Sequence, residues 1–160
     1  FEVGTRNGDI LACVALFAKH AYSAENATRY CPVLEARGLT VLCEDFRKYD
    51  PSDLPGLPKG ETPDVYFWWP MHAAMQNEEW MLHIRDALWG NGLGKGKRVV
   101  IAFDHNWAAD RASLANLKAK YGEAMRAEEY TVDYAEGRHW RASGTFSLLH
   151  LHLDPMPSPD

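Results

Sequence analysis

Apolar positions follow two different periods along this chain, and the two periods alternate from one segment to the next. Short apolar runs of the kind found in strands occur at Phe1–Val3, Ala21–Ala24, Leu39–Cys43, Asp64–Trp69 and Arg98–Phe103. Between them, apolar residues spaced three and four apart predict helices over Asp9–Lys19, Thr28–Arg37, Asn77–Trp89 and Ser113–Tyr121.

Some of these elements carry a further signal. Ile10, Leu11, Val14 and Phe17 are predicted to form the buried face of the first helix. Gly38 follows the second helix, at the position where a glycine commonly ends one. The run Arg98–Phe103 has an unbroken apolar core, which indicates a central parallel strand covered on both faces.

The alternation of strands and helices stops after Tyr121. Glu129–Tyr134 and Thr145–Leu153 are predicted strands separated only by a polar turn around Glu136–Gly144, so they should form an antiparallel hairpin. The whole pattern predicts an α/β fold: a doubly wound, mostly parallel sheet with helices on both faces and a C-terminal antiparallel β-hairpin.

The length of 160 residues fits one domain. We expect it to span residues 1–154, with a proline-rich tail at 155–160 and a proline-rich surface connection at 50–63. The chain opens on Phe1 rather than Met, so we do not expect Phe1 to be the natural start of translation.

Charge and hydropathy argue against nucleic acid and membrane as partners. The net charge is −5, whereas a nucleic-acid surface needs clustered Lys and Arg, so a nucleic-acid partner is disfavoured. No apolar run approaches the roughly 18 residues that cross a bilayer. Cys13, Cys31 and Cys43 are odd in number and form no CxxC pair, which predicts buried, reduced thiols and a reducing, cytoplasmic compartment.

The segment from Glu2 to Asp9 reads E-x-G-x-x-x-G and joins a strand to a helix. Glycine tolerates a positive φ and lets a ligand approach the backbone, and the first amides of a helix attract an anionic group. Taken alone, the pattern fits an ordinary tight turn equally well.

Two acidic residues follow the next two strands. Glu25 comes about 20 residues after the glycine turn, where an acid accepts the ribose hydroxyls in nucleotide-binding folds. Asp45 could accept from an exocyclic amine, while Phe46 offers its amide and ring to a purine. Each acid could also be a solvated carboxylate. Together with Glu2, however, they place three acids at the carboxyl ends of successive strands, which favours a shared ligand site.

This arrangement resembles the class I methyltransferases, and the resemblance runs from Glu2 to Leu153. It implies S-adenosylmethionine as the cofactor, with Glu2, Gly4, Thr5 and Gly8 around its methionine part, Glu25 and Asn26 at the ribose, and Asp45 and Phe46 at the adenine. Arg6 departs from the family pattern, which often has glycine at this position. The methyl acceptor, a small molecule or a protein, is not identified by the resemblance.

In that family the end of the fourth strand faces the transferred methyl group. This position holds Trp68 and Trp69, with His72 close behind. An aromatic face attracts a sulfonium, so Trp68 is a candidate for cofactor binding. His72 is the candidate catalytic base. The competing interpretation makes the tryptophans core residues and His72 a surface residue.

No metal site is predicted. Asp104-His105-Asn106 lacks a second acid at the end of the fourth strand, which argues against magnesium. His150 and His152 share one face of a strand, but no Cys or acidic partner stands at ligand spacing, which favours structural or surface histidines. The glycine-rich run Gly90–Lys97 leads from helix to strand, opposite to a phosphate loop.

Two other functions remain open. A nicotinamide-dependent oxidoreductase would use the same turn and the same Glu25, but Arg6 removes the Gly-x-Gly pair and the terminal hairpin also argues against it. A non-catalytic relative would keep the scaffold and bind a partner, with its many aromatic residues at the interface.

Overall fold

The computed structural model describes residues 1–6, 8–69, 74–122, 128–134 and 144–152. Its strands form one sheet in the order β3-β2-β1-β4-β5-β7-β6. The strands are β1 (Glu2–Val3), β2 (Tyr22–Ala24), β3 (Thr40–Leu42), β4 (Val65–Trp68), β5 (Arg98–Asp104), β6 (Glu128–Tyr134) and β7 (Gly144–His152).

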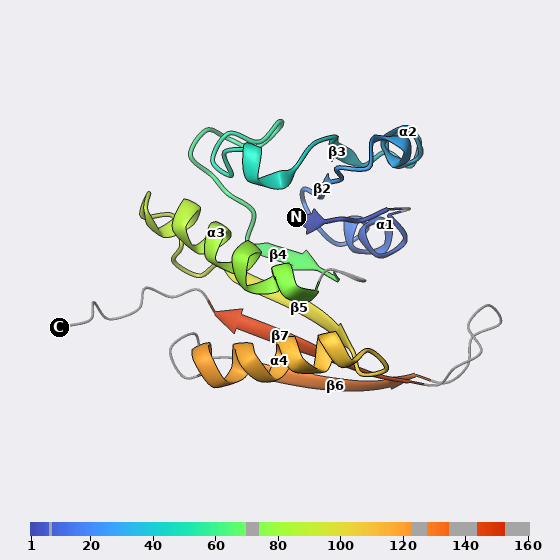
Figure 1. The fold of residues 1–160 in the computed structure, drawn as a ribbon. Helices are drawn as coiled ribbons and strands as arrows, with labels where there is room; N and C mark the ends of the chain where they lie inside the picture. Colours follow the sequence, from blue (N-terminus) through green and yellow to red (C-terminus); the bar gives the residue numbers. More distant parts are fainter. Residues whose placement is uncertain (7, 70–73, 123–127, 135–143, 153–160) are drawn as a thin grey trace.

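The first five strands run parallel, whereas β7 is antiparallel to both of its neighbours, β5 and β6. In Figure 1 the arrow of β7 accordingly points against those of β5 and β6. The predicted fold, a mostly parallel sheet closed by an antiparallel hairpin, is confirmed.

Helices cover both faces of the sheet. They are α1 (Asp9–Ala15), α2 (Cys31–Ala36), α3 (Asn77–Trp89) and α4 (Ala108–Tyr121), with short 3₁₀ turns η1 (Thr28–Tyr30), η2 (Phe46–Lys48) and η3 (Ala74–Gln76). In Figure 1, α3 and α4 lie in front of the sheet. The main core lies between them and β5, which supplies the buried side chains of Val99, Ile101 and Phe103.

A smaller core holds α1 and α2 on the other face. Leu11, Leu34 and Leu39 are buried together there, and Val41 of β3 packs against them while its neighbour Leu42 faces the main core. Side chains of a strand alternate between faces, so β3 contributes to both layers.

Gly38 ends α2 as predicted. It has φ 77°, its N–H donates to the Glu35 carbonyl, and the Leu39 N–H donates to the Leu34 carbonyl. These two bonds define a Schellman motif, and the accompanying apolar contact is the one between Leu34 and Leu39.

Three helices differ from the prediction in their bounds. α2 begins at Cys31 rather than Thr28, because Thr28–Tyr30 forms the 3₁₀ turn η1. α1 ends at Ala15 rather than Lys19, and of its predicted buried face only Leu11 is buried, while Phe17 is 91% exposed. α4 begins at Ala108 rather than Ser113. Its first turn is held by the buried Asp110, which accepts a hydrogen bond from the Asp104 N–H (2.9 Å).

The prediction of buried, reduced thiols is wrong. Cys31 at the start of α2 and Cys43 after β3 form a disulfide, with Cα atoms 6.1 Å apart, and Cys13 is free and exposed. Sequence spacing does not reveal this pair, because packing of α2 beside β3 brings the two cysteines together. The inference of a reducing compartment therefore loses its premise.

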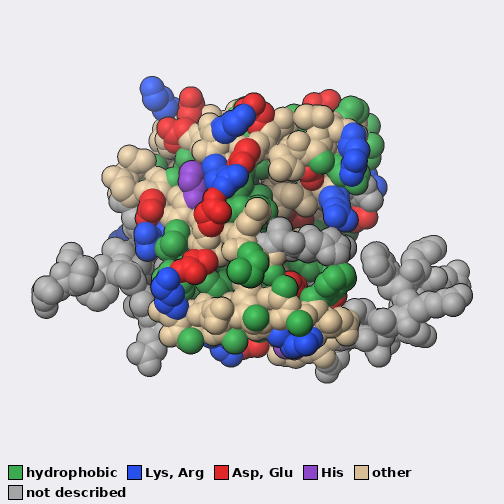
Figure 2. Space-filling view, viewed as in Figure 1, with side chains coloured by type: hydrophobic (Ala, Val, Ile, Leu, Met, Phe, Trp, Pro, Cys, Tyr) green, Lys and Arg blue, Asp and Glu red, His purple; other side chains and the backbone are tan. Residues whose placement is uncertain are grey.

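Among the helices in the described residues, none is long and apolar enough to cross a bilayer. On the face of the molecule shown in Figure 2, acidic and basic side chains are interspersed rather than gathered into a patch of one sign.

Candidate cofactor-binding site

Among its described residues, the turn between β1 and α1 contains three with positive φ: Gly4 (73°), Arg6 (50°) and Gly8 (72°). A Cβ at Gly8 would lie 2.6 Å from Leu34 Cδ2, so this glycine permits the close approach of α2. A Cβ at Gly4 would meet no atom within 4 Å, so the backbone at Gly4 is open to an incoming group.

The amides of this turn make bonds within the chain. The Gly4 N–H donates to the Ala24 carbonyl (2.8 Å), and the Gly8 N–H donates to the Thr5 carbonyl (2.9 Å). The Arg6 N–H donates to the Glu25 carboxylate (2.8 Å). The expectation that a row of amides would be free for an anionic group is therefore wrong for these three positions.

Glu25 ties two loops together. One carboxylate oxygen accepts from Arg6 and the other from the Ala27 N–H (2.8 Å), and the side chain is buried. A carboxylate can accept about four hydrogen bonds, so these two amides leave about two acceptor positions of Glu25 unused. The bonds present hold the glycine turn against the loop that follows β2.

Glu2 and Thr5 lie beneath the turn, on the side of α1. The Thr5 hydroxyl donates to the Glu2 carboxylate, and the Leu11 backbone N–H also hydrogen bonds to it. Burial raises the pKa of Glu2 above its ordinary value, although these bonds act in the opposite direction. Glu2 thus occupies the start of α1 where an external anion was expected.

A hollow of about 110 Å³ opens at the carboxyl ends of β1, β2 and β3. It brings together four of the predicted cofactor-binding residues: Gly4, Asn26, Asp45 and Phe46. The remaining lining residues are Val3, Ala24, Glu44, Arg47, Gln76 and Trp80. Because ligand pockets are typically ~300–1,000 Å³, this hollow matches only part of a nucleoside cofactor.

Asp45 caps η2 and forms an ion pair within the chain. Its carboxylate accepts from the Arg47 N–H (3.0 Å) and from the Arg47 guanidinium, which also contacts Glu79. The side-chain hydrogen bonds from Arg47 lower the pKa of Asp45 to about 2. Asp45 is therefore ionised at neutral pH, and its partner Arg47 also lines the hollow.

Phe46 anchors the inner wall. Its ring is buried and makes edge contacts with Trp80 and His83, with ring centroids 5.4 Å apart in both cases. Trp80 and Gln76 come from the segment η3–α3, which the sequence did not connect with the cofactor. The sequence spacing of Gln76 and Trp80 does not indicate that they line the hollow, because this depends on how α3 packs against Phe46 of η2.

The structure corrects the prediction for Trp68. Its side chain is 0% exposed, its indole N–H donates to Asn77 Oδ1 (2.9 Å), and its ring packs edge-on against Trp80. Trp68 is a core residue and presents no face to the hollow. Trp69 is half-buried, and the candidate base His72 lies outside the described residues.

A larger hollow, of about 570 Å³, lies at the opposite ends of the parallel strands. It is lined by residues at the amino ends of strands, including Tyr22, Val65 and Lys97. Ligands of open α/β sheets bind at the carboxyl ends of the strands, so we place the candidate cofactor site at the smaller hollow.

No family model matches the sequence, and no curated protein sequence matches it. Solved structures do match. A putative RNA methyltransferase from Pyrococcus horikoshii aligns with TM-score 0.62 at 12% identity, over 94% of this chain and 72% of that chain. A precorrin-6y C5,15-methyltransferase from Geobacter metallireducens aligns with TM-score 0.58 at 14% identity, over 94% and 77%.

A precorrin 8W decarboxylase from Methanobacterium thermoautotrophicum aligns with TM-score 0.57 at 15% identity, over 94% of this chain and 78% of that chain. These likenesses extend over nearly the whole chain at low identity. They show that the chain shares the Rossmann-like α/β fold of these proteins.

Proposed function

We propose that this chain binds S-adenosylmethionine at the hollow beside β1, β2 and β3 and transfers its methyl group to an acceptor. The observation that supports this most is the meeting of Gly4, Asn26, Asp45 and Phe46 at the carboxyl ends of three neighbouring parallel strands. The family resemblance of the sequence assigns the same four residues to the cofactor.

In this proposal the hollow receives the adenosine part of the cofactor. Asp45 accepts from the exocyclic amine of the adenine, and the buried ring of Phe46 packs against the base. Glu25 offers its remaining acceptor positions to the ribose, while open space at Gly4 lets the ligand approach the backbone. The adenosine end thus fits residues that are present.

The cofactor supplies an activated methyl group on a sulfonium, so the main task of the protein is alignment. Holding acceptor and methyl donor in line, away from water, contributes a large part of the rate enhancement. A general base assists where the acceptor carries a proton. We propose His72 for that role, following its place after β4.

The decisive experiment is calorimetric titration with S-adenosylhomocysteine, S-adenosylmethionine and NADH. We expect the first two to bind with one site per chain and NADH to give no heat. Absence of heat for both sulfur ligands at millimolar concentration would contradict the proposal, and binding of NADH alone would support an oxidoreductase instead.

The side chain of Asp45 offers the sharpest test within the site. Asp45→Ala should weaken binding of S-adenosylhomocysteine by at least about tenfold, as expected for a hydrogen bond to a charged group. Asp50→Ala is the matched control, because Asp50 belongs to the same region but its side chain bonds with Ser52 and does not line the hollow. Equal affinity in the two variants would remove Asp45 from the cofactor site.

A non-catalytic scaffold is the second candidate. It is favoured by the small volume of the hollow and by the internal bonds of Gly4, Arg6 and Gly8. Methyl transfer from labelled S-adenosylmethionine to any acceptor would exclude it. Sulfur-ligand binding without turnover across a panel of acceptors would favour it.

A further inference from the structure

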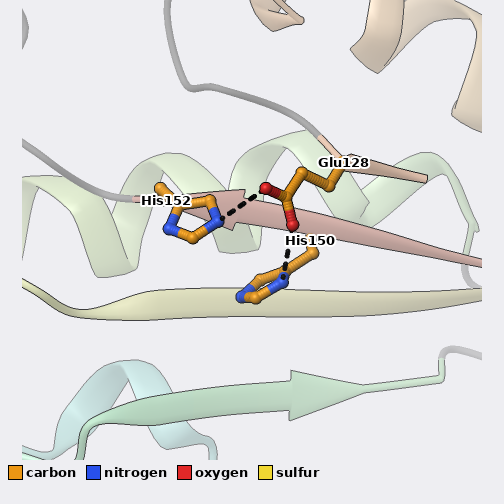
Figure 3. A group of neighbouring side chains, drawn as sticks. All are labelled: Glu128, His150 and His152. Carbon is orange, nitrogen blue, oxygen red and sulfur yellow. Dashed lines mark ion pairs between the residues drawn. The ribbon is translucent and has the colours of Figure 1, made fainter. Parts of the chain in front are cut away.

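Two histidines and a glutamate meet on one face of the terminal hairpin. His150 and His152 project from the same face of β7, and Glu128 of β6 lies directly opposite His150 in the strand register. Figure 3 shows both imidazole rings turned toward the Glu128 carboxylate. His150 Nδ1 is 3.6 Å from Glu128 Oε2, and His152 Nε2 is 3.5 Å from Glu128 Oε1.

The three side chains could share one ion. Each offers a ligand atom, and these atoms all lie within 4.8 Å of one another. The two rings stack with centroids 4.5 Å apart, so they present their nitrogens to a common region. Within the described part of the chain, His150 Nε2 is buried without a hydrogen-bond partner, and His152 Nε2 is buried with only the 3.5 Å contact to Glu128.

The carboxylate is also held in position. The Tyr130 hydroxyl donates to Glu128 Oε2 at 2.8 Å. Groups that orient a ligand in this way are typical of metal centres, where they fix the direction of the ligating atom. Arg98 of β5 lies opposite His152 in the register and adds one positive charge to the surroundings, which the Glu128 charge offsets.

We propose that Glu128, His150 and His152 form a binding site for a divalent transition-metal ion, with Zn²⁺ as the ion that suits them best. Two imidazoles and one carboxylate are a known ligand set for zinc, which takes such ligands at about 2.0–2.2 Å and adds a fourth from water or another group. To bind the ion, the three ligand atoms, which lie within 4.8 Å of one another, need to close to the spacing of a tetrahedral set.

This site is separate from the proposed cofactor site. His152 pairs with Arg98, the first residue of β5, so the cluster lies at the amino end of that strand. The hollow beside β1, β2 and β3 lies at the carboxyl ends of the parallel strands. A metal here would join β6 to β7 and stabilise the hairpin, with no contact to the transferred methyl group.

Sequence spacing reveals no acidic partner for the two histidines, because Glu128 is remote from them along the chain. Only the antiparallel register of β6 and β7 places it across from His150. Ligand spacing within one segment therefore could not reveal the site.

The test uses the whole chain after treatment with a chelator, and ZnCl₂ is the probe. We expect one Zn²⁺ per chain, and binding weakened at least tenfold in each of Glu128→Gln, His150→Ala and His152→Ala, because even loss of a group that only orients a ligand costs ~10–100-fold. His20→Ala is the matched control, since His20 is exposed and remote from the hairpin.

Three further measurements separate a metal site from a histidine-rich surface. Tyr130→Phe should weaken Zn²⁺ binding without removing a ligand, and Arg98→Gln should strengthen it about twofold at low salt by removing a like charge. Co²⁺ bound to the unmodified protein should show the visible absorption of a four-coordinate site, a readout that does not depend on any variant folding.

The result that overturns the proposal is Zn²⁺ affinity equal in wild type, His150→Ala and His152→Ala, or Co²⁺ that stays six-coordinate and water-like. Binding of S-adenosylhomocysteine should be the same in all hairpin variants. Failure of the metal site and failure of the proposed methyltransferase function are therefore distinguishable.

Discussion

Glu25 and Asp45 each make bonds within the chain that shape the candidate site. Glu25 holds the glycine turn against the loop after β2, and Asp45 caps η2 and pairs with Arg47. Their positions at strand ends were readable from the sequence. The partners of Glu25 were not, because Arg6 and Ala27 bond to it through backbone amides, which any residue type supplies.

For Glu25 we expect a loss of stability as well as a loss of affinity. Glu25→Gln replaces one acceptor oxygen by a donor that faces a backbone N–H, and leaving a buried group unsatisfied costs about 1–3 kcal/mol. Urea unfolding without ligand measures this. Unchanged stability would mean that the two amide bonds do not hold the loops.

The ion pair between Asp45 and Arg47 should be visible in the pKa of the Asp45 carboxyl. A carboxyl with a lowered folded-state pKa contributes stability above its ordinary pKa of 3.8, and the contribution is lost as pH falls through about 2. NMR titration of the Asp45 carboxyl should therefore give a pKa near 2, and Arg47→Ala should bring it back toward 3.8. Arg85→Ala, which removes an arginine paired with Asp86, should leave it unchanged.

The bounds predicted from the apolar spacing agree best with the structure for α3 and β5, which pack into the main core. The bounds of α3 match the prediction, and β5 extends it by only one residue, because these elements carry the main core. α1 is shorter than predicted since Phe17 finds no core to join. α4 starts earlier than predicted because the Asp110 carboxylate, in its first turn, accepts a hydrogen bond from the Asp104 N–H. The helix has no side-chain N-cap, so the sequence carries no capping signal at this position.

The two glycines of the β1–α1 connection should differ when replaced by alanine. Gly8→Ala combines left-handed strain with overlap against Leu34 and Leu39, so we expect destabilisation of about 2 kcal/mol or more. Gly4→Ala meets no atom, so only the strain of about 1 kcal/mol applies. Thermal unfolding of the pair checks the order, and a larger loss in Gly4→Ala would contradict the packing.

At the level of the whole chain, the mostly parallel sheet and the reversed β7 are predictable, because strands and helices alternate up to α4 and no helix follows it. The disulfide and the meeting of Glu128 with His150 are not predictable in this way. Each depends on which elements become neighbours in space, and a single sequence carries no direct record of that.

The disulfide makes a global prediction. Thiol titration of the unfolded protein should find one reactive thiol, Cys13, before reduction and three after it. Reduction should lower stability by about 3 kcal/mol, the usual effect of opening a short loop. Three reactive thiols without reductant would show that Cys31 and Cys43 are not bonded.

The place of β7 between β5 and β6 has a consequence for synthesis. On the ribosome, β6 emerges before β7, yet in the described part of the chain β6 pairs with no strand but β7. The nascent chain must therefore wait with β5 as an unprotected edge until residue 152 has left the exit tunnel. During that interval the half-built sheet presents a row of unpaired backbone groups to other chains, which makes it a natural client for chaperones.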